Sequence, residues 1–117
     1  MKRIRQIYWR QSLKISYGIT VCNEHEELDN LLHHLSKHIR KEDEVVVTQD
    51  ISKVGDSSIV QDKFYAIEKV LEKYEYGTWF QPRQLKVTTF KFNKDFAALK
   101  NYTKQNCSGD YIFHIDA

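Results

Sequence analysis

The sequence predicts a one-domain α/β protein in which strands and helices alternate along the chain. Two observations predict this class. Apolar, β-branched segments recur four times, and each of the three stretches between them carries apolar residues at helical spacing. Alternation of this kind is typical of a parallel sheet with right-handed crossovers. The expected order is therefore β-α-β-α-β-α-β, a Rossmann-like parallel sheet at residues 13–117, preceded by a basic N-terminal arm at residues 1–12.

The first strand and helix are expected at residues 13–22 and 23–41. The strand segment, LKISYGITVC, is apolar and β-branched. In the helix, Asn23 is the expected N-cap, and glutamates in the first turn suit the positive end of the helix dipole. The apolar stripe of this helix consists of Leu28, Leu31, Leu32, Leu35 and Ile39. The second strand, DEVVVTQD at residues 43–50, is nearly continuously apolar, as expected when both faces are buried.

A loop at residues 51–58 leads into a second amphipathic helix at residues 59–76. Its apolar side carries Ile67, Val70, Leu71 and Tyr74. Tyr76, Trp79 and Phe80, beside Pro82, could form a binding surface, but we expect this turn to pack onto the helix. The third strand, LKVTTFKF, is expected at residues 85–92.

The third helix is expected at residues 93–106, and it has only a partial apolar stripe. That stripe consists of Phe96, Leu99 and Tyr102. The segment from Tyr111 to Asp116 is then predicted to be a buried strand that ends in a carboxylate. His114 inside it is interpreted as a core or interface histidine.

Composition limits the classes of function. The chain has 117 residues, 41% of them hydrophobic and 29% charged, which is ordinary for a globular protein. A net charge of +2 is too small to indicate a nucleic-acid partner. No apolar run approaches the ~20 residues of a membrane span, and no secretory signal is recognisable, so the cytoplasm is the expected compartment. Cys22 and Cys107 are far apart and outside any CxxC pair, which favours two reduced thiols.

The carboxyl ends of parallel strands meet at one edge of a sheet, where α/β proteins bind ligands. Asp50 and Asp116 end two of the predicted strands, so two carboxylates are expected at this edge. They could hold ribose hydroxyls, a base edge or a divalent metal, or they could merely cap loops. The first βα turn, TVCNEHEE, has no glycine, which excludes a dinucleotide fingerprint or P-loop there. A metal near Asp116 is then the simplest way to hold phosphates.

Four segments, in order, resemble the N-terminal half of the family 2 glycosyltransferases, which have the GT-A fold. They are ISYGITVCNEHEELDNLL, DEVVVTQDIS, NKDFAALKN and GDYIFHIDA. In that family a first strand ends in P-T-Y-N-E, a second in D-D-G-S, a later helix carries an R-N pair, and a further strand ends in D-x-D. The resemblance extends over about residues 14–117.

The resemblance implies a nucleotide-diphospho-sugar ligand, most simply a UDP-sugar, with Mn²⁺ or Mg²⁺. Thr20 stands where the family contacts the nucleotide, and Asp50 and Ser52 stand in the D-D-G-S motif, which binds the base edge. Lys100 and Asn101 stand at the R-N pair. Asp116 is the first acid of D-x-D, beside the ribose and the metal.

The sequence also departs from the family pattern. Thr20, Val21 and Cys22 replace P-T-Y, while Gln49 replaces the first acid of D-D-G-S and Ile51 its glycine. The second acid of D-x-D would be residue 118. We therefore expect a truncated GT-A fold that ends at the D-x-D motif, with the catalytic base beyond it and no transferase activity in the 117 residues alone.

In the GT-A sheet the D-x-D strand is interior, between the first strand and a later one. Without the later strand, residues Tyr111 to Ile115 are expected to present a free apolar edge. Ile112, Phe113 or Ile115 would then be exposed. The expected consequence is self-association through this strand, or a displaced C-terminus that hides it.

Two other functions stay open. One is a non-catalytic binding or interaction module that reuses the half-fold. The other is a different Rossmann enzyme such as a methyltransferase, against which the glycine-free first turn argues. His34 and His38 have the i, i+4 spacing of zinc ligands, but without a third ligand they are interpreted as solvated helix residues.

Overall fold

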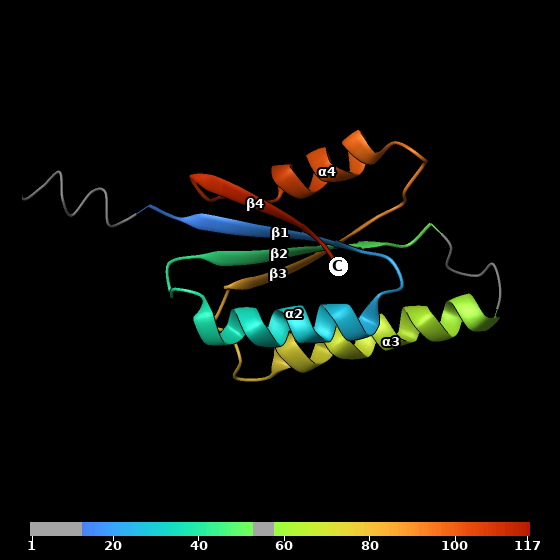
Figure 1. The fold of residues 1–117 in the computed structure, drawn as a ribbon, viewed down its shortest axis with the longest axis horizontal. Coiled ribbons are helices and arrows are strands. Elements are labelled where there is room, and N and C mark those ends of the chain that lie inside the picture. Colours follow the sequence, from blue (N-terminus) through green and yellow to red (C-terminus); the bar gives the residue numbers. More distant parts are fainter. Residues whose placement is uncertain (1–12, 53–57) are drawn as a thin grey trace, which may run out of the picture.

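The computed structural model describes residues 13–52 and 58–117, in which four parallel strands form one sheet (Figure 1). The strands are β1 (Ile15–Val21), β2 (Glu44–Asp50), β3 (Leu85–Phe90) and β4 (Tyr111–Asp116), in the spatial order β3-β2-β1-β4. The predicted fold class is confirmed. The basic arm at residues 1–12 and most of the predicted loop after β2 lie outside the described residues.

Three helices connect these strands. They are α2 (His25–His38), α3 (Ser58–Tyr76) and α4 (Phe96–Gln105). Helices α2 and α3 pack side by side on one face of the sheet, and α4 lies on the opposite face (Figure 1). Side chains of a strand point alternately to its two faces. Thus Val45 and Val47 face α2 and α3, whereas Thr48 faces α4 and accepts a hydrogen bond from Thr103.

The hydrophobic core lies between the sheet and the α2–α3 layer. It consists of Ile19, Val21, Leu28, Leu32, Leu35, Val45, Val47, Ile67, Leu71 and Tyr74. The predicted stripes of α2 and α3 supply six of these residues, with Leu31, Ile39 and Val70 partly buried beside them. Strand β2 is buried from Glu44 to Gln49, which confirms that both of its faces are covered.

Two predictions at helix ends are wrong. Helix α2 has Glu24, not Asn23, at its N-cap, and Glu24 instead accepts hydrogen bonds from the N–H groups of Cys22 and Asn23 in the preceding turn. In α4, Phe96 is 68% exposed and does not join the core, because the helix begins there, directly after its N-cap Asp95. Leu99 carries the buried side of α4, together with Thr103.

The prediction that β4 is a buried strand is also wrong. The strand pairs with β1 alone and forms one edge of the sheet. Tyr111 and Phe113 are 62% and 64% exposed, whereas Ile112 and Ile115 are half-buried. His114 is likewise exposed and is not a core histidine. Of the three side chains expected to face solvent at a free edge, Phe113 does so.

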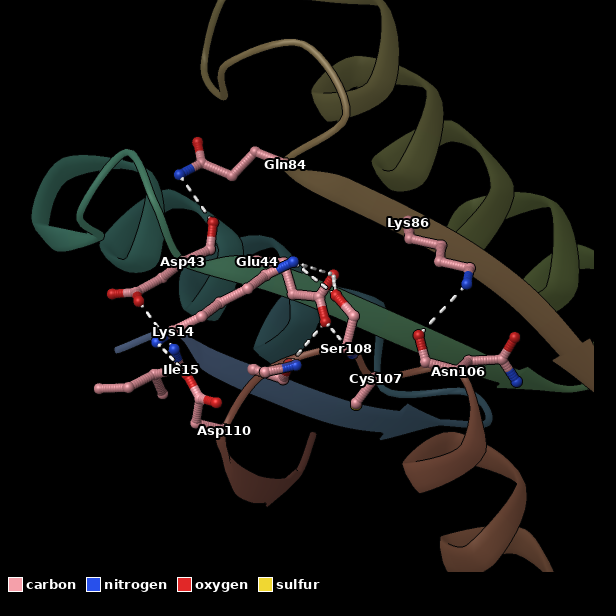
Figure 2. A network of polar contacts seen from close by, with 12 residues as sticks. Lys14, Ile15, Asp43, Glu44, Gln84, Lys86, Asn106, Cys107, Ser108 and Asp110 are labelled. Carbon is pink, nitrogen blue, oxygen red and sulfur yellow. Dashed lines mark hydrogen bonds and ion pairs between the residues drawn. The ribbon is translucent and has the colours of Figure 1, made fainter. Parts of the chain in front are cut away.

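A buried polar network centred on Glu44 joins the amino ends of β1 and β2 to the loop before β4 (Figure 2). The Glu44 carboxylate accepts hydrogen bonds from the Ser108 N–H and from the Ser16 and Ser108 hydroxyls. The Lys14 ammonium lies 3.3 Å from Glu44 Oε1. Burial raises the pKa of Glu44, but the donors and the cation outweigh it and hold the pKa below its ordinary value.

Asp43, directly before β2, extends the network to Arg40 and to the start of β1. Its Oδ1 accepts a hydrogen bond from the Ile15 N–H at 2.8 Å, and the Arg40 guanidinium donates to both carboxylate oxygens. Burial raises the pKa of Asp43, but the Arg40 guanidinium and the Ile15 N–H lower it by more. The pKa of Asp43 therefore lies below its ordinary value. Gln84, at the start of β3, donates to the carbonyl oxygens of Arg40 and Asp43. The network thus connects residues at the amino end of all four strands.

The first prediction concerns acid stability. Because the pKa of Glu44 is lower in the folded protein than in the unfolded chain, ionised Glu44 stabilises the fold above about pH 4.5, and this contribution is lost as the pH falls through the folded pKa. Glu44→Gln should lower the free energy of unfolding at pH 7 by about 2–3 kcal/mol. Its stability should also fall less steeply than that of the wild type below about pH 4.5. Urea unfolding at a series of pH values measures both effects.

Glu72→Gln is the matched control, since Glu72 is an exposed glutamate on α3. Its unfolding should follow the wild-type pH dependence. Equal acid sensitivity of Glu44→Gln and wild type would contradict the assigned role of the Glu44 carboxylate.

Candidate functional site

A pocket of about 430 Å³ opens at the carboxyl edge of the sheet, on the side of α4. Its walls come from the ends of β1, β2 and β4, the loop after β3, and the first turns of α4. The lining residues are Thr20, Val21, Cys22, Asn23, Glu24, Asp50, Phe92, Phe96, Leu99, Lys100, Asp116 and Ala117. Four of the six residues predicted to bind the nucleotide therefore line one cavity: Thr20, Asp50, Lys100 and Asp116.

Asp116 and Thr20 form the contact between β4 and β1 in this pocket. The two residues are opposite each other in the parallel register, and both point to the α4 face. The Thr20 hydroxyl donates to Asp116 Oδ1 at 2.8 Å. This bond orients the carboxylate, and it leaves Oδ2 without a hydrogen bond from the described residues. Asp116 can therefore accept from a ligand hydroxyl or a metal-bound water.

Asp50 lies at the end of β2 and is held by two backbone groups. Its Oδ1 accepts from the Ser52 N–H at 2.8 Å and from the Phe92 N–H at 3.3 Å. The first bond closes a short turn after the strand, and the second joins β2 to the loop after β3. Asp50 therefore does cap a loop, as the simpler interpretation of the sequence held, and it also lines the pocket.

The other predicted residues are placed differently. Lys100 is exposed on α4 and lines the pocket, and no other lysine or arginine is among the described lining residues. Asn101 is exposed on α4 but does not line the pocket. Ser52 contributes its backbone N–H to the Asp50 turn and is also absent from the pocket walls.

Two aromatic residues of the pocket were not recognised in the sequence. The Phe92 and Phe96 rings lie 4.8 Å apart between centroids, and both rings border the cavity. They flank the short NKD segment between β3 and α4. The signal in the sequence was an aromatic residue on each side of a polar turn. It was missed because periodicity assigned Phe92 to a strand and Phe96 to a helix, so the two were not considered together. Together with Leu99 they give the pocket an apolar wall.

The described residues that line the pocket carry an excess of negative charge. Asp50, Asp116 and Glu24 contribute three carboxylates and Lys100 one ammonium. Within residues 13–52 and 58–117, no group of three or more His, Cys, Asp or Glu side chains is placed to hold a metal ion. A Mg²⁺ ion that arrives with phosphates needs only one or two carboxylates, and Asp116 fits that requirement.

Gln49 is an unexpected feature beside the site. It precedes Asp50 on β2, and strand alternation turns it to the α2–α3 face, away from the pocket. The side chain is 1% exposed, and neither its Nε2 nor its Oε1 has a hydrogen-bond partner among the described residues. A buried carboxamide without partners costs free energy. Gln49 stands at the position that the resemblance aligns with the first acid of D-D-G-S, but its side chain does not face the cavity.

The remaining predicted features lie away from the pocket. Tyr74 contacts the rings of Trp79 and Phe80 with centroids 5.6 and 6.2 Å apart, so the turn after α3 packs onto that helix as predicted. Tyr76 does not take part in this packing, since it is 85% exposed. His34 and His38 are exposed on α2 with ring centroids 4.5 Å apart. Cys22 and Cys107 are not joined by a disulfide, as predicted.

Comparisons with protein-family models, with curated proteins and with solved structures found no match. The glycosyltransferase resemblance therefore stays a hypothesis carried by the four sequence motifs. Among the helices in the described part of the chain, none is long and apolar enough to cross a membrane.

The second prediction concerns the unpartnered amide. Gln49→Leu replaces a buried carboxamide by an apolar group of similar size, and it should raise the free energy of unfolding by about 1–3 kcal/mol. Urea unfolding of the variant and the wild type measures the difference.

Gln84→Leu is the matched control, because Gln84 is 5% exposed but fully engaged in hydrogen bonds. Its Nε2 donates to two carbonyl oxygens and its Oε1 accepts from the Gln81 N–H. This substitution should destabilise the protein. A loss of stability in both variants would show that the Gln49 amide has partners in solution.

Proposed function

We propose that the chain binds a nucleotide-diphospho-sugar, the donor of glycosyl transfer, in the pocket at the carboxyl edge of the sheet. The observation that carries the proposal is the convergence of Thr20, Asp50, Lys100 and Asp116 on one cavity from four separate segments. Strand topology predicts Asp50 and Asp116 at this edge, and the motif resemblance adds Thr20 and Lys100. Their convergence is what a binding site requires.

The chemistry of the walls favours a ligand rich in hydroxyl groups with an apolar face. Asp50 and Asp116 each keep a carboxylate oxygen without a hydrogen bond from the described residues, and such oxygens accept from ribose or sugar hydroxyls. The Phe92 and Phe96 rings offer an apolar surface against which a base or a sugar ring can lie. The pocket volume of about 430 Å³ lies within the range of small-molecule sites.

The charge of the pocket limits how phosphates enter. Three carboxylates repel a free diphosphate, and Lys100 alone does not neutralise them. A diphosphate that carries a divalent cation has a lower negative charge and meets Asp116 favourably. When bound, such a cation stabilises the charge of the departing diphosphate. Lys100 would lie on the opposite wall, on α4, as a second positive group.

The proposed role of this chain is donor binding within an inverting transfer. In that reaction a base deprotonates the acceptor hydroxyl, which attacks the anomeric carbon as the nucleoside diphosphate leaves. No residue of this pocket is assigned as the base. Asp50 would hold the base edge of the nucleotide, and Asp116 would accept from the ribose and the metal-bound water.

The third prediction is nucleotide binding that depends on the pocket carboxylates. Calorimetric titration with UDP and Mn²⁺ should give a dissociation constant of about 1 mM or weaker, a binding free energy near −4 kcal/mol. Asp50→Asn keeps an oxygen that can accept from the Ser52 and Phe92 N–H groups, so the loop stays anchored. It should nevertheless weaken UDP binding at least about tenfold.

Asp62→Asn serves as the control, because Asp62 is exposed on α3 outside the pocket. UDP binding should be unchanged in it. Micromolar binding that survives Asp50→Asn would refute the site. No measurable binding in the wild type would favour a second candidate function, an interaction module. The exposed aromatic side chains of Tyr111 and Phe113 on β4 support that alternative.

A further inference from the structure

The apolar wall of the pocket is a pair of phenylalanines on either side of a short hydrogen-bonded turn. The Phe92 and Phe96 rings lie 4.8 Å apart between centroids and are tilted by 45° to each other. Between them, Asn93 Oδ1 accepts from the Asp95 N–H at 3.3 Å, and Asp95 Oδ1 accepts from the Ala98 N–H at 3.1 Å. The turn therefore holds the two rings together in the absence of a ligand, which lowers the ordering cost of binding.

This pair is the part of the pocket that suits a flat, uncharged group. Phe96 is 68% exposed and Phe92 is half-buried, so both rings keep surface outside the protein core. Two tilted rings allow a flat group to stack on one of them and to meet the edge of the other. No other described residue that lines the pocket is aromatic.

A carboxylate lies directly beside the phenylalanine pair. The Phe92 N–H donates to Asp50 Oδ1 at 3.3 Å, so the end of β2 contacts the turn that carries the rings. Asp50 Oδ1 also accepts from the Ser52 N–H, whereas Oδ2 has no hydrogen bond from the described residues. An ionised carboxylate only accepts hydrogen bonds. A flat group that stacks on the rings and donates an N–H from its edge therefore meets both features at once, and a nucleobase is such a group.

The position of Asp116 agrees with a base at this end of the pocket. Asp50 ends β2 and Asp116 ends β4, and β1 lies between these two strands. Neighbouring strands are about 4.8 Å apart, so β2 and β4 are separated by roughly 10 Å. A base and its attached ribose together span such a distance. A nucleotide whose base reaches Asp50 therefore brings its ribose to Asp116.

We infer that Phe92 and Phe96 form the stacking surface for the base of the nucleotide, and that the transferred sugar does not lie against them. This inference rests on the proposed function and adds which group of the ligand meets the aromatic wall. With the base at the rings and the ribose at Asp116, the diphosphate and the sugar lie farther from the rings. Stacking tolerates any base, because every base has a π face. The pair therefore supplies affinity, while Asp50 reads the edge of the base.

The fourth prediction is that UDP binding depends on the aromatic ring of Phe96. Phe96→Leu keeps an apolar side chain but removes the ring, and it should raise the UDP dissociation constant at least about fivefold. Phe96→Tyr keeps the ring and should bind UDP as the wild type does. UDP-glucose should lose affinity for Phe96→Leu by the same factor as UDP, because the lost contact is to the base. NMR titrations over millimolar ligand concentrations, with Mg²⁺ present, measure these constants.

Phe113→Leu is the matched control for the loss of an exposed ring. Phe113 is a phenylalanine of similar exposure, 64%, and it lies on β4 outside the pocket walls. The variant should bind UDP and UDP-glucose with wild-type affinity. An equal loss of UDP affinity in Phe113→Leu and Phe96→Leu would show that the effect does not come from the pocket, and it would overturn the inference.

The fifth prediction concerns the orientation of bound UDP. In saturation-transfer difference NMR, the ligand protons closest to the protein receive the most magnetisation. With the wild type and Mg²⁺, the uracil ring protons should therefore receive more than the anomeric proton of the ribose. This excess should fall in Phe96→Leu and persist in Phe113→Leu. An excess on the ribose in the wild type would contradict a base stacked on the rings.

The titrations separate a failure of this inference from a failure of the proposed function. UDP binding that Asp50→Asn weakens but Phe96→Leu leaves unchanged would overturn the inference alone. A loss of affinity for UDP-glucose without a loss for UDP would do the same, because it would place the sugar against the rings. No UDP binding to the wild type would overturn both.

Discussion

The register of the sheet depends on two adjacent buried acids, Asp43 and Glu44. Parallel strands are joined by long crossovers, so no tight turn sets their alignment. Here Asp43 binds the backbone of Ile15, and Glu44 binds Ser16, 28 residues away, and Ser108, 64 residues away. Both carboxylates are compensated by a cation and by several donors, which is the condition under which buried charge is tolerated. A slip of one residue would break these bonds and turn every core side chain to the wrong face.

The alignment at the amino edge determines what meets at the carboxyl edge. Seven-residue strands transmit the register, so that Thr20 lies opposite both Thr48 and Asp116. Asp50 falls two residues beyond Thr48 on the same α4 face and closes the floor of the pocket. Helix α4 then supplies one wall, and its position is tied to the sheet by the Thr103–Thr48 hydrogen bond and the Thr88–Tyr102 bond. The candidate site is thus a consequence of strand register rather than of any single loop.

Much of this arrangement could be predicted from the sequence, and the failures have identifiable causes. Helical spacing located the buried faces of α2 and α3, because each buries one continuous stripe. The run YIFHID was misassigned as buried, since a short apolar run does not reveal whether its strand is interior or at an edge. Phe96 was wrongly assigned to the buried stripe of α4, because the helix begins only at that residue and its side chain does not face the sheet. Glu44 and Ser108 could not be paired from sequence at all, because their contact depends on the order of the strands.

The two ends of the sheet differ in how well their polar groups are satisfied, and this difference bears on function. At the amino edge the buried carboxylates of Asp43 and Glu44 and the Gln84 amide are fully engaged. At the carboxyl edge Gln49 is buried without partners, and Asp50 and Asp116 each engage one oxygen through the described residues. A protein selected for stability alone would satisfy both ends alike, since apolar replacements for Gln49 are sterically simple. Local departures of this kind concentrate at functional sites. The amino edge therefore holds the fold together, while at the carboxyl edge Asp50 and Asp116 retain carboxylate oxygens that a ligand in the pocket can use.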